Sequence, residues 1–367
     1  MNSCATKALW LRILGLLSAL AGASRLSAAE SAEQMIAAAK QEGDEIIFVA
    51  GAQTFGGRKG LGEIEAAFNK KFGLKARINF AAGPDMNARA ARHITEIKSG
   101  GKVSSDIFLG SQSHLALLHK ENALEKVNYA KLFPWVTQPM EIFPGEGVLV
   151  YTSPNGIIYN SHLIAKDKAP KSYLDLIDPR LSQSWAGKVA IPPYVAWLAE
   201  LSLNWGKEKV KDFARKLVAI SGGRLRYSEE ERIVSGEFPI MANIGDALGA
   251  MWTWQTKGAP LVAVPGTSPA NTDYFQLAVP KNAVHPNLAK LFTAFMATKE
   301  AQAVLQKYES RSSHLVEGTI MSKYLNDNRI ALQQPKESID YYLKGGDTAE
   351  GLQFKEDLAK ILKQSGR

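Results

Sequence analysis

The chain has 367 residues, of which 46% are hydrophobic and 22% are charged, a composition typical of globular proteins. This length exceeds what one hydrophobic core usually supports, so two lobes of ordinary domain size are expected. The formal net charge of +8 is mild and its basic residues are interspersed with acidic ones. Such a surface argues against a nucleic-acid partner.

The first 29 residues have the pattern of a cleavable secretory signal peptide. Lys7 and Arg12 precede the apolar run 13–23, and small residues at 27–29 supply a cleavage site. A membrane anchor is less well supported, because the run is shorter than the ~20 residues needed to span a bilayer. Cleavage also removes Arg25, which lowers the net charge from +8 to +5 because all three charged residues of the segment are basic. We therefore expect a periplasmic protein.

The single cysteine, Cys4, lies before the apolar run and does not end a lipoprotein signal motif. The mature chain is therefore expected to lack cysteine altogether. This excludes disulfides, cysteine nucleophiles and thiolate metal sites, so the mature protein must be stabilised by core burial.

The first half of the mature chain predicts helices alternating with strands. Ser31 and Gln34 form a capping box before a short helix that stops at Gly43. Strands are expected at 45–50, 77–81 and 105–109, and helices at 61–72 and 85–100. This alternation predicts a mainly parallel, doubly wound sheet.

A glycine-rich loop, residues 51–60, follows the first expected strand. Such a loop places backbone N–H groups and a helix N-terminus at the carboxyl end of the strand, where open α/β sheets bind ligands. Its glycines do not match the G-x-G-x-x-G pattern of dinucleotide-binding loops. A ligand loop and a flexible turn are equally good interpretations.

The second half begins with a turn cluster at residues 153–156. The pattern then predicts strands at 157–159, 189–191, 239–242, 261–265 and 274–281, with helices at 194–205, 208–220 and from His285 onward. Residues 266–272 form a polar loop that returns the chain to the first lobe. After Tyr308 we expect helices and loops that brace the lobes.

An ordered set of short motifs lies between residues 159 and 188. It reads Tyr159-Asn160, then 170–176 (PKSYLDL), then Asp178-Pro179, then 185–188 (WAGK). In this order the motifs resemble the extracellular solute-binding proteins of bacterial ABC importers, in the branch with ferric, thiamine, phosphonate and polyamine relatives. The resemblance covers roughly residues 36–302.

This resemblance implies an α/β, two-lobed periplasmic binding protein type II-like fold, each lobe a mainly parallel sheet flanked by helices. The first lobe would contain residues 30–150 and 270–340, and the second residues 151–269, with a C-terminal helical segment at 341–367. The implied function is capture of a small-molecule ligand by hinge closure and its delivery to an ABC permease in the inner membrane. We expect a monomer that is not an enzyme and needs no cofactor. A binding protein that reports to a membrane sensor is an alternative.

Ferric members of this branch bind iron through an early histidine, a glutamate after the third strand and adjacent tyrosines. The matching positions here hold Gln53, Ser111 and the pair Asp246-Ala247, so the phenolate donors are missing and no metal site is expected. Ferric-ion binding is kept as the alternative ligand. The pair Tyr341-Tyr342 lies far downstream and is expected to pack within a terminal helix.

Polar and aromatic residues at the expected cleft suit a small polar organic solute, an anion or a zwitterion. Arg226 could hold a carboxylate or phosphonate by two hydrogen bonds, or it could pair instead with neighbouring glutamates. Trp252 and Trp254 are either stacking platforms or ordinary core residues. The predicted ligand-binding residues are Gln53, Thr54, Ser111, Gln112, Tyr194, Trp197, Arg226, Tyr227, Asp246, Asp273 and Tyr274.

Enzyme motifs are weak in this chain. Its six histidines show no H-E-x-x-H spacing, and no G-x-S-x-G elbow occurs. A secreted hydrolase with a Ser-His-Asp site assembled from distant positions is left as an alternative, because such triads are spatial rather than sequential.

Overall fold

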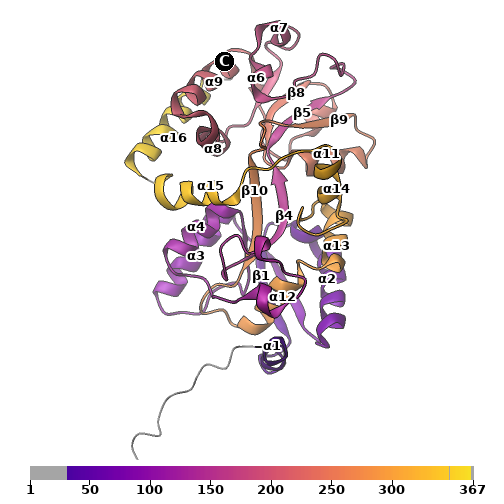
Figure 1. Cartoon of the computed structure of the whole chain (residues 1–367), viewed down its shortest axis with the longest axis vertical. Helices are drawn as coiled ribbons and strands as arrows, with labels where there is room; N and C mark the ends of the chain where they lie inside the picture. The colour runs from indigo at the N-terminus through magenta and orange to yellow at the C-terminus, as the bar shows by residue number, and fades with distance from the viewer. Residues whose placement is uncertain (1–30, 347, 365–367) are drawn as a thin grey trace, which may run out of the picture.

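The computed structural model describes residues 31–346 and 348–364, and these form two lobes joined by long strands (Figure 1). Strand β4 (Val148–Pro154) leads into β5 (Gly156–Asn160), and β9 (Leu261–Pro265) leads back into β10 (Thr272–Ala278). These two passages carry the chain from one lobe to the other and back. The predicted two-lobed α/β fold is confirmed.

The first lobe is built on two small sheets that lie side by side. Strands β1 (Glu45–Ala50) and β2 (Arg77–Ala82) pair in parallel, and β3 (Phe108–Gly110) joins β10 and β4 in the order β3-β10-β4. A parallel bridge between Phe48 and Ile107 links the two sheets. The helices around them are α1 (Ala32–Ala39), α2 (Gly57–Phe72), α3 (Met86–Lys98), α4 (Gln112–Lys120), α5 (Tyr129–Leu132), α12 (Pro286–Phe295) and α13 (Lys299–Glu309).

The second lobe contains one five-stranded sheet in the order β7-β6-β8-β5-β9. Its remaining strands are β6 (Val189–Ile191), β7 (Ser221–Arg224) and β8 (Ile240–Ile244). Its helices are α6 (Tyr173–Leu176), α7 (Pro179–Ser182), α8 (Ala196–Trp205), α9 (Lys207–Ala219), α10 (Glu231–Val234) and α11 (Ala247–Gln255). Helix α8 follows the carboxyl end of β6, and helix α11 follows the carboxyl end of β8. Both helices contribute residues to the side of this lobe that faces the first lobe.

Strand directions are mixed within each lobe. The pairs β1–β2, β6–β7 and β6–β8 are parallel, as the alternation of strands and helices predicts. The pairs β3–β10, β4–β10, β5–β8 and β5–β9 are antiparallel. The prediction of mainly parallel sheets is therefore corrected for the crossing strands, because a chain that leaves on one strand and returns on its neighbour must run antiparallel.

The predicted turn at residues 153–156 is wrong. Ser153 and Pro154 end β4 and Gly156 begins β5, so the backbone stays extended between the lobes. A Cβ at Gly156 would lie 2.2 Å from the carbonyl oxygen of Val264 on β9. This glycine therefore allows a close approach of two strands and does not form a turn.

Most of the glycine-rich segment is helical. A short 3-10 turn at Thr54–Gly56 runs directly into α2, which begins at Gly57 rather than at the predicted residue 61. A Cβ at Gly60 would lie 1.9 Å from the carbonyl oxygen of Phe55. The glycines thus permit tight packing of the first helical turn. Of the glycine-rich loop predicted at residues 51–60, only residues 51–53 are non-helical.

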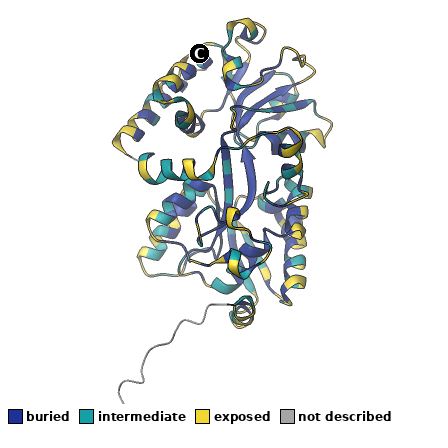
Figure 2. Cartoon of the chain, viewed as in Figure 1, coloured by how far each residue is buried: buried dark blue, intermediate teal, exposed yellow. Residues whose placement is uncertain are grey.

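Each lobe has its own hydrophobic core (Figure 2). In the first lobe Phe68 packs edge-on against Phe292 and Phe295, with ring centroids 5.6 Å apart in each pair. In the second lobe the ring of Tyr173 lies 5.3 Å from that of Trp197. Burial of each such side chain contributes roughly 1.5–3 kcal/mol. Two separate cores allow the lobes to move as two bodies.

The C-terminal segment connects the lobes a third time. It comprises α14 (Ile320–Asp327), α15 (Pro335–Asp340), a π-helical turn (Tyr341–Gly345) and α16 (Ala349–Leu362). Helix α15 packs on α4 of the first lobe, while α16 packs on α9 and places Phe354 and Leu358 in the core of the second lobe. Figure 1 shows this passage in yellow, with α15 at the middle left and α16 above it.

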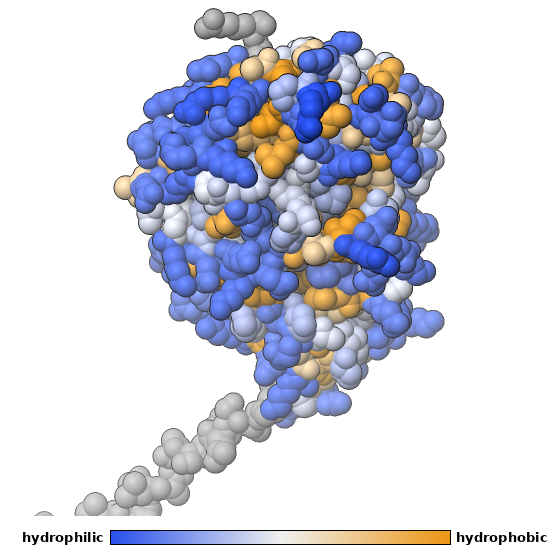
Figure 3. Space-filling model, turned by 45° about the horizontal axis from the view of Figure 1, so that its top comes forward, coloured by the Kyte–Doolittle hydropathy of each residue, from blue (hydrophilic) through white to orange (hydrophobic). Residues whose placement is uncertain are grey.

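Few large apolar side chains lie on the surface. The face in Figure 3 is mostly hydrophilic, with hydrophobic side chains scattered among polar ones. No helix within the described ranges is long and apolar enough to cross a membrane. Across the described residues, the exposed large hydrophobic side chains are Leu163, Leu174, Tyr194, Val284 and Leu352.

Candidate ligand-binding site

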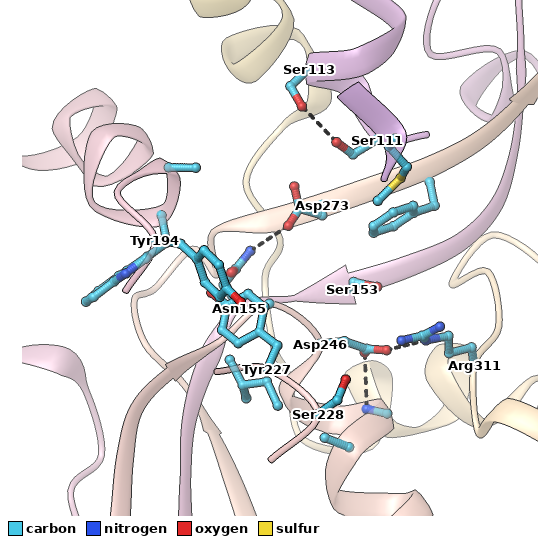
Figure 4. A pocket seen from close by; sticks show the side chains of 18 of the residues that line it. Ser111, Ser113, Ser153, Asn155, Tyr194, Tyr227, Ser228, Asp246, Asp273 and Arg311 are labelled. Carbon is cyan, nitrogen blue, oxygen red and sulfur yellow. Dashed lines mark hydrogen bonds and ion pairs between the residues drawn. The ribbon is translucent and has the colours of Figure 1, made fainter. Parts of the chain in front are cut away.

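A cavity of about 570 Å³ lies between the lobes, and both lobes contribute to its walls. This is within the usual size range of small-molecule sites. Figure 4 shows it from close by. Polar, charged and aromatic side chains of four parts of the chain line this cavity. They include Ser111, Ser113 and His114 from the first lobe; Ser153, Asn155, Asp273 and Phe275 from the crossing strands; Tyr194, Trp197, Glu200, Tyr227, Glu230, Asp246 and Trp254 from the second lobe; and Glu309, Arg311 and Tyr342 from the last sixty residues.

One face of the crossing ribbon β4–β10 forms part of the cavity wall. Asp273 lies opposite Ser153 in the antiparallel ladder, so their side chains share this face. Asn155 lies two residues beyond Ser153, and its Nδ2 donates a hydrogen bond of 3.2 Å to Asp273 Oδ2. Towards the first lobe the same face carries Phe275, whose ring stacks on Tyr151 at 4.5 Å. The face therefore has a polar end and an aromatic end.

Two buried polar atoms in the cavity wall have no hydrogen-bond partner among the described residues. They are Ser153 Oγ on β4, at a residue with 0% exposure, and Trp197 Nε1 on α8, at a residue with 3% exposure. An unpaired buried donor or acceptor costs about 1–3 kcal/mol. Native structures rarely tolerate such a cost without a reason. A bound molecule that reaches both walls would supply the missing partners.

Aromatic side chains form the wall on the second lobe. The rings of Tyr194 and Tyr227 lie 4.7 Å apart, and Tyr194 is 40% exposed. The hydroxyl of Tyr227 accepts a 2.9 Å hydrogen bond from Asn243 Nδ2, while Tyr173 donates to Asn243 Oδ1. Hydrogen bonds to buried polar groups thus fix the position of Tyr227, whereas Tyr194 lies at the exposed rim of the cavity.

Carboxylates outnumber cations around the cavity. Among the described lining residues Glu200, Glu230, Asp246, Asp273 and Glu309 are acidic, whereas Arg311 carries the basic charge. Arg311 is already engaged: its Nε lies 2.6 Å from Asp246 Oδ2, and its Nη1 lies 3.3 Å from Glu309 Oε2. Because Asp246 caps α11 of the second lobe and Arg311 follows α13 of the first, this ion pair joins the lobes.

Two of these carboxyl groups have perturbed pKa values. Burial raises the pKa of Asp273, and the hydrogen bond from Asn155 offsets part of this effect. Burial, together with the nearby Asp273 charge, raises the pKa of Glu200, whose carboxylate accepts a hydrogen bond from the Tyr342 hydroxyl. Both groups therefore take up a proton more readily than ordinary carboxyl groups do, unless a positive charge is brought close to them.

The structure brings six of the eleven predicted site residues into this cavity. Gln53 and Thr54 line a neighbouring cavity of about 610 Å³, which shares Thr253, Glu309 and Arg311 with the first. The six in the main cavity are Ser111, Tyr194, Trp197, Tyr227, Asp246 and Asp273.

The remaining three predicted residues lie elsewhere. Gln112 is buried and bonds the backbone of β10 through both amide atoms, at 3.1 Å and 2.8 Å. Tyr274 donates from Oη to the carbonyl oxygen of Gln333 at 2.5 Å. Arg226 is exposed and is not among the lining residues, and its backbone N–H donates to Glu229. These three contacts are structural, so we leave the three residues out of the proposed site.

Several lining residues were missed from the sequence. Ser153 and Asn155 were assigned to a turn, although the period of two along an extended strand would have placed both on the face of Tyr151. Arg311 gave no signal, because it follows the last recognisable motif. Tyr342 was expected to pack within a terminal helix, yet it lines the cavity and donates to Glu200.

The fold and the cavity together define a class: a two-lobed solute-binding protein whose site lies between the lobes. A sequence model of one family, described as bacterial extracellular solute-binding protein, matches residues 47–308. The chain belongs to this family. No curated protein matches it.

Solved structures support the same fold. Iron-bound HitA from Pseudomonas aeruginosa superposes with a TM-score of 0.65 at 18% identity, covering 86% of this chain and 99% of that one. Apo ferric ion-binding protein A from Pasteurella haemolytica gives 0.66 at 15% identity, with coverage of 88% and 99%. The spermidine/putrescine substrate-binding protein of Streptococcus pneumoniae gives 0.63 at 16%, with coverage of 88% and 99%. At these identities the likeness shows the fold alone.

Metal ligands do not cluster in the part of the chain that the structure describes. Within it, no group of three or more histidine, cysteine, aspartate or glutamate side chains is arranged to hold a metal ion. Of the positions that the family resemblance matches to ferric ligands, Ser111 and Asp246 line the main cavity and Gln53 lines the neighbouring one.

Proposed function

We propose that the chain is the periplasmic substrate-binding component of an ABC importer, which captures a small polar organic solute and delivers it to a permease in the inner membrane. The observation that carries this is the pair of unpartnered buried atoms, Ser153 Oγ on the crossing strand β4 and Trp197 Nε1 on α8 of the second lobe, at two residues that line one cavity. A solute that contacts both walls binds the closed arrangement better than the open one. Such a difference in affinity is what drives closure.

Hinge closure needs short segments that change backbone angles between two rigid bodies. The candidates are Asn155, between β4 and β5, and residues 266–271, between β9 and β10. They lie close to the lobe boundaries that the sequence predicts at 150/151 and 269/270. The C-terminal passage from α15 to α16 must bend with them, because it contacts both lobes.

A hydrolase is the competing function, and one contact in the cavity bears on it. Ser111 Oγ lies 2.9 Å from His114 Nδ1. Burial, aided by the Arg89 charge, lowers the pKa of His114 to about 4. A general base works best with a pKa near the working pH, so this histidine is a poor base for activating Ser111. The pair suits a polar contact to a ligand better than catalysis.

Closure can be measured by fluorescence energy transfer in the mature chain. The sequence has no cysteine after Cys4, so exposed positions on the two lobes, Lys70→Cys and Lys166→Cys, can carry a dye pair. Small solutes of several classes would be added: amines, amino acids, carboxylates, phosphonates and ferric salts. A double-label on one lobe, Lys70→Cys with Lys98→Cys, serves as the control.

We expect one class of solute to raise transfer efficiency between the lobes, to leave the one-lobe control unchanged, and to be recovered chemically intact by mass spectrometry. Recovery of a cleaved solute would show that the protein is a hydrolase and would contradict the proposed transport function. Binding without any change between the lobes would contradict hinge closure. Failure of every class to bind would remove the proposed function.

A further inference from the structure

Three side chains with oxygen acceptors occupy neighbouring positions at the polar end of the crossing ribbon and line the cavity. The acceptors are the unpartnered Ser153 Oγ, the Asn155 side-chain oxygen and the carboxylate of Asp273. Asp273 and Ser153 are cross-strand neighbours, and Asn155 already donates to Asp273 through its amide nitrogen. That bond leaves Asn155 Oδ1 turned to accept from elsewhere. Figure 4 shows Asn155 beside Asp273, with Ser153 farther along β4.

Asp273 lacks a positive partner. Among the described residues no lysine, arginine or histidine forms an ion pair with it, and the one guanidinium of the cavity is held by Asp246 and Glu309. Burial of a carboxylate without a cation is unfavourable unless a ligand brings the charge. The raised pKa of Asp273 agrees with this unpaired state.

The space in front of these oxygens is kept open by a glycine. Gly245 follows β8, and its φ is not in the left-handed region. A Cβ built on it would lie 3.5 Å from the Tyr227 ring, 3.7 Å from Asn155 Oδ1 and 3.9 Å from Asp273 Oδ2. These are ordinary van der Waals contacts. An alanine there would fit without strain but would fill the space among the three groups.

We infer that this corner binds the primary ammonium group of the solute, with its three N–H donors directed to Ser153 Oγ, Asn155 Oδ1 and Asp273, beside the ring of Tyr227. The inference rests on the proposed function and narrows its substrate class to amines. A primary ammonium has three donors and no acceptor, which matches an acceptor set of three oxygens. A nearby aromatic face further favours a cation.

This assignment differs from the expectation of an anion based on Arg226, because that side chain lies outside the cavity. A zwitterionic solute still agrees with the assignment, because it carries an ammonium group. Trp197 Nε1 still needs an acceptor, so an amine that also carries a hydroxyl, carbonyl or carboxylate oxygen would satisfy both walls.

The test uses the mature chain and calorimetric titration with three matched panels. The first contains primary amines with aromatic and aliphatic bodies, such as 2-phenylethylamine, 2-amino-1-phenylethanol and 1,5-diaminopentane. The second contains their N-trimethylated forms, which keep the charge but lose every N–H donor. The third contains carboxylates of the same length. Gly245→Ala is the test variant, and Gly62→Ala, which adds a methyl group to exposed space on α2, is the control.

We expect a primary amine to bind at least tenfold more tightly than its trimethylated form, and its carboxylate counterpart not to bind. Gly245→Ala should weaken amine binding at least tenfold with an unchanged melting temperature, whereas Gly62→Ala should leave affinity unchanged. Equal or tighter binding of trimethylated forms or carboxylates, or no binding by any amine, overturns the inference. If another solute class binds and closes the lobes, the inference fails and the proposed function stands. If no class binds, both fail.

Discussion

The two faces of the β4–β10 ribbon have the same backbone but opposite chemistry. On the cavity face Ser153 has no partner and Asp273 has no cation. On the opposite face every polar group named here is satisfied: Thr152 Oγ1 lies 2.7 Å from His314 Nδ1, and Tyr274 Oη donates to Gln333. Gln112 adds two bonds to the backbone of β10. The polar groups of one face are satisfied within the fold, and we propose that those of the other face meet a ligand.

This difference yields a rule for assigning function along a strand. Neighbouring residues point to opposite faces, so polar residues at adjacent positions cannot both reach one cavity. A partnered polar side chain then affects folding, and an unpartnered one affects binding. Substitutions at adjacent positions should therefore separate stability from affinity.

The largest separation is expected between Asp273→Asn and Tyr274→Phe. Asp273→Asn removes a charge-assisted hydrogen bond, which contributes about 1.5–3 kcal/mol, so amine affinity should fall roughly 10-fold to 150-fold. Tyr274→Phe removes the bond to Gln333 and should lower the free energy of unfolding by about 1 kcal/mol without changing affinity. Calorimetry and chemical denaturation measure the two effects. If Tyr274→Phe loses amine affinity while Asp273→Asn keeps it, the face that carries Tyr274 binds the solute and the assignment of the two faces is wrong.

The second prediction concerns pH and follows from the raised pKa of Asp273. A carboxylate binds an ammonium only when ionised, so amine affinity should be full above the raised pKa and should be lost as the pH falls through it. This loss should occur at a higher pH than for an ordinary aspartate. Glu200 and Asp246 also interact with Asp273, so Asp273→Asn is the control. If Asp273→Asn loses amine affinity at acidic pH to the same extent as the wild-type chain, a group other than Asp273 causes the pH dependence.

The same pKa shift makes a prediction about the ligand-free protein. Since folding raises the pKa of Asp273, the carboxylate lowers stability as the pH rises from the unfolded-state pKa to the folded-state value. Asp273→Asn should therefore melt at a higher temperature than the wild-type chain at neutral pH. The difference should shrink as the pH falls and should vanish below pH 3.8, the ordinary pKa of aspartate, where the carboxyl group is protonated in both states. A variant that melts lower at neutral pH would show that Asp273 stabilises the fold.

A smaller separation is expected between Ser153→Ala and Thr152→Val. Ser153→Ala removes a buried hydroxyl that has no partner in the ligand-free protein. Amine affinity should fall about 2-fold to 10-fold, for a net hydrogen bond of roughly 0.5–1.5 kcal/mol, whereas the free energy of unfolding should rise by up to about 1–3 kcal/mol because the unpaired group is gone. Thr152→Val keeps the shape but leaves His314 Nδ1 unpaired, which should lower stability by about 1–3 kcal/mol at unchanged affinity. Equal stability losses in both variants would mean that Ser153 has a structural partner.

The smallest effect is expected for the ion pair between the lobes. Arg311 is partly exposed, and such pairs contribute about 0.2–1 kcal/mol. Arg311→Gln should therefore weaken solute binding less than fivefold and shift the ligand-free population towards lower transfer efficiency between labelled lobes. Lys307→Gln, which breaks the Lys307–Glu63 pair, is the matched control within one lobe. A higher transfer efficiency in Arg311→Gln would mean that this ion pair holds the lobes apart.

Much of the fold follows from local sequence signals. The capping box at Ser31, the strand 45–50, the cap at Asp85 and the strand 261–265 were all predicted and all occur, because each depends on neighbouring residues only. The turn at 153–156 was wrong because a Ser-Pro-Asn-Gly sequence has turn chemistry, whereas long-range pairing with β9 and β10 keeps it extended.

The site was harder to predict than the fold. Ser111, Tyr194, Trp197, Tyr227, Asp246 and Asp273 were predicted to lie at a cleft, and all six line the cavity. Tyr274 was included because strand alternation was not applied to it. Gln112 was included because its side chain, at the start of α4, could not be foreseen to turn back onto the backbone of β10. Arg311 and Tyr342 could not be found, since they enter the cavity from segments whose path depends on how α13 and α15 pack on other elements.

The central claim is that the oxygens on the cavity face of the ribbon hold the ammonium of a captured solute. A crystal structure of the mature chain with its tightest amine measures this directly. The account predicts the amine nitrogen within hydrogen-bond distance of Asp273, Asn155 and Ser153, with both lobes in contact with the molecule. An amine bound elsewhere, or with its nitrogen turned away from Asp273, would contradict it.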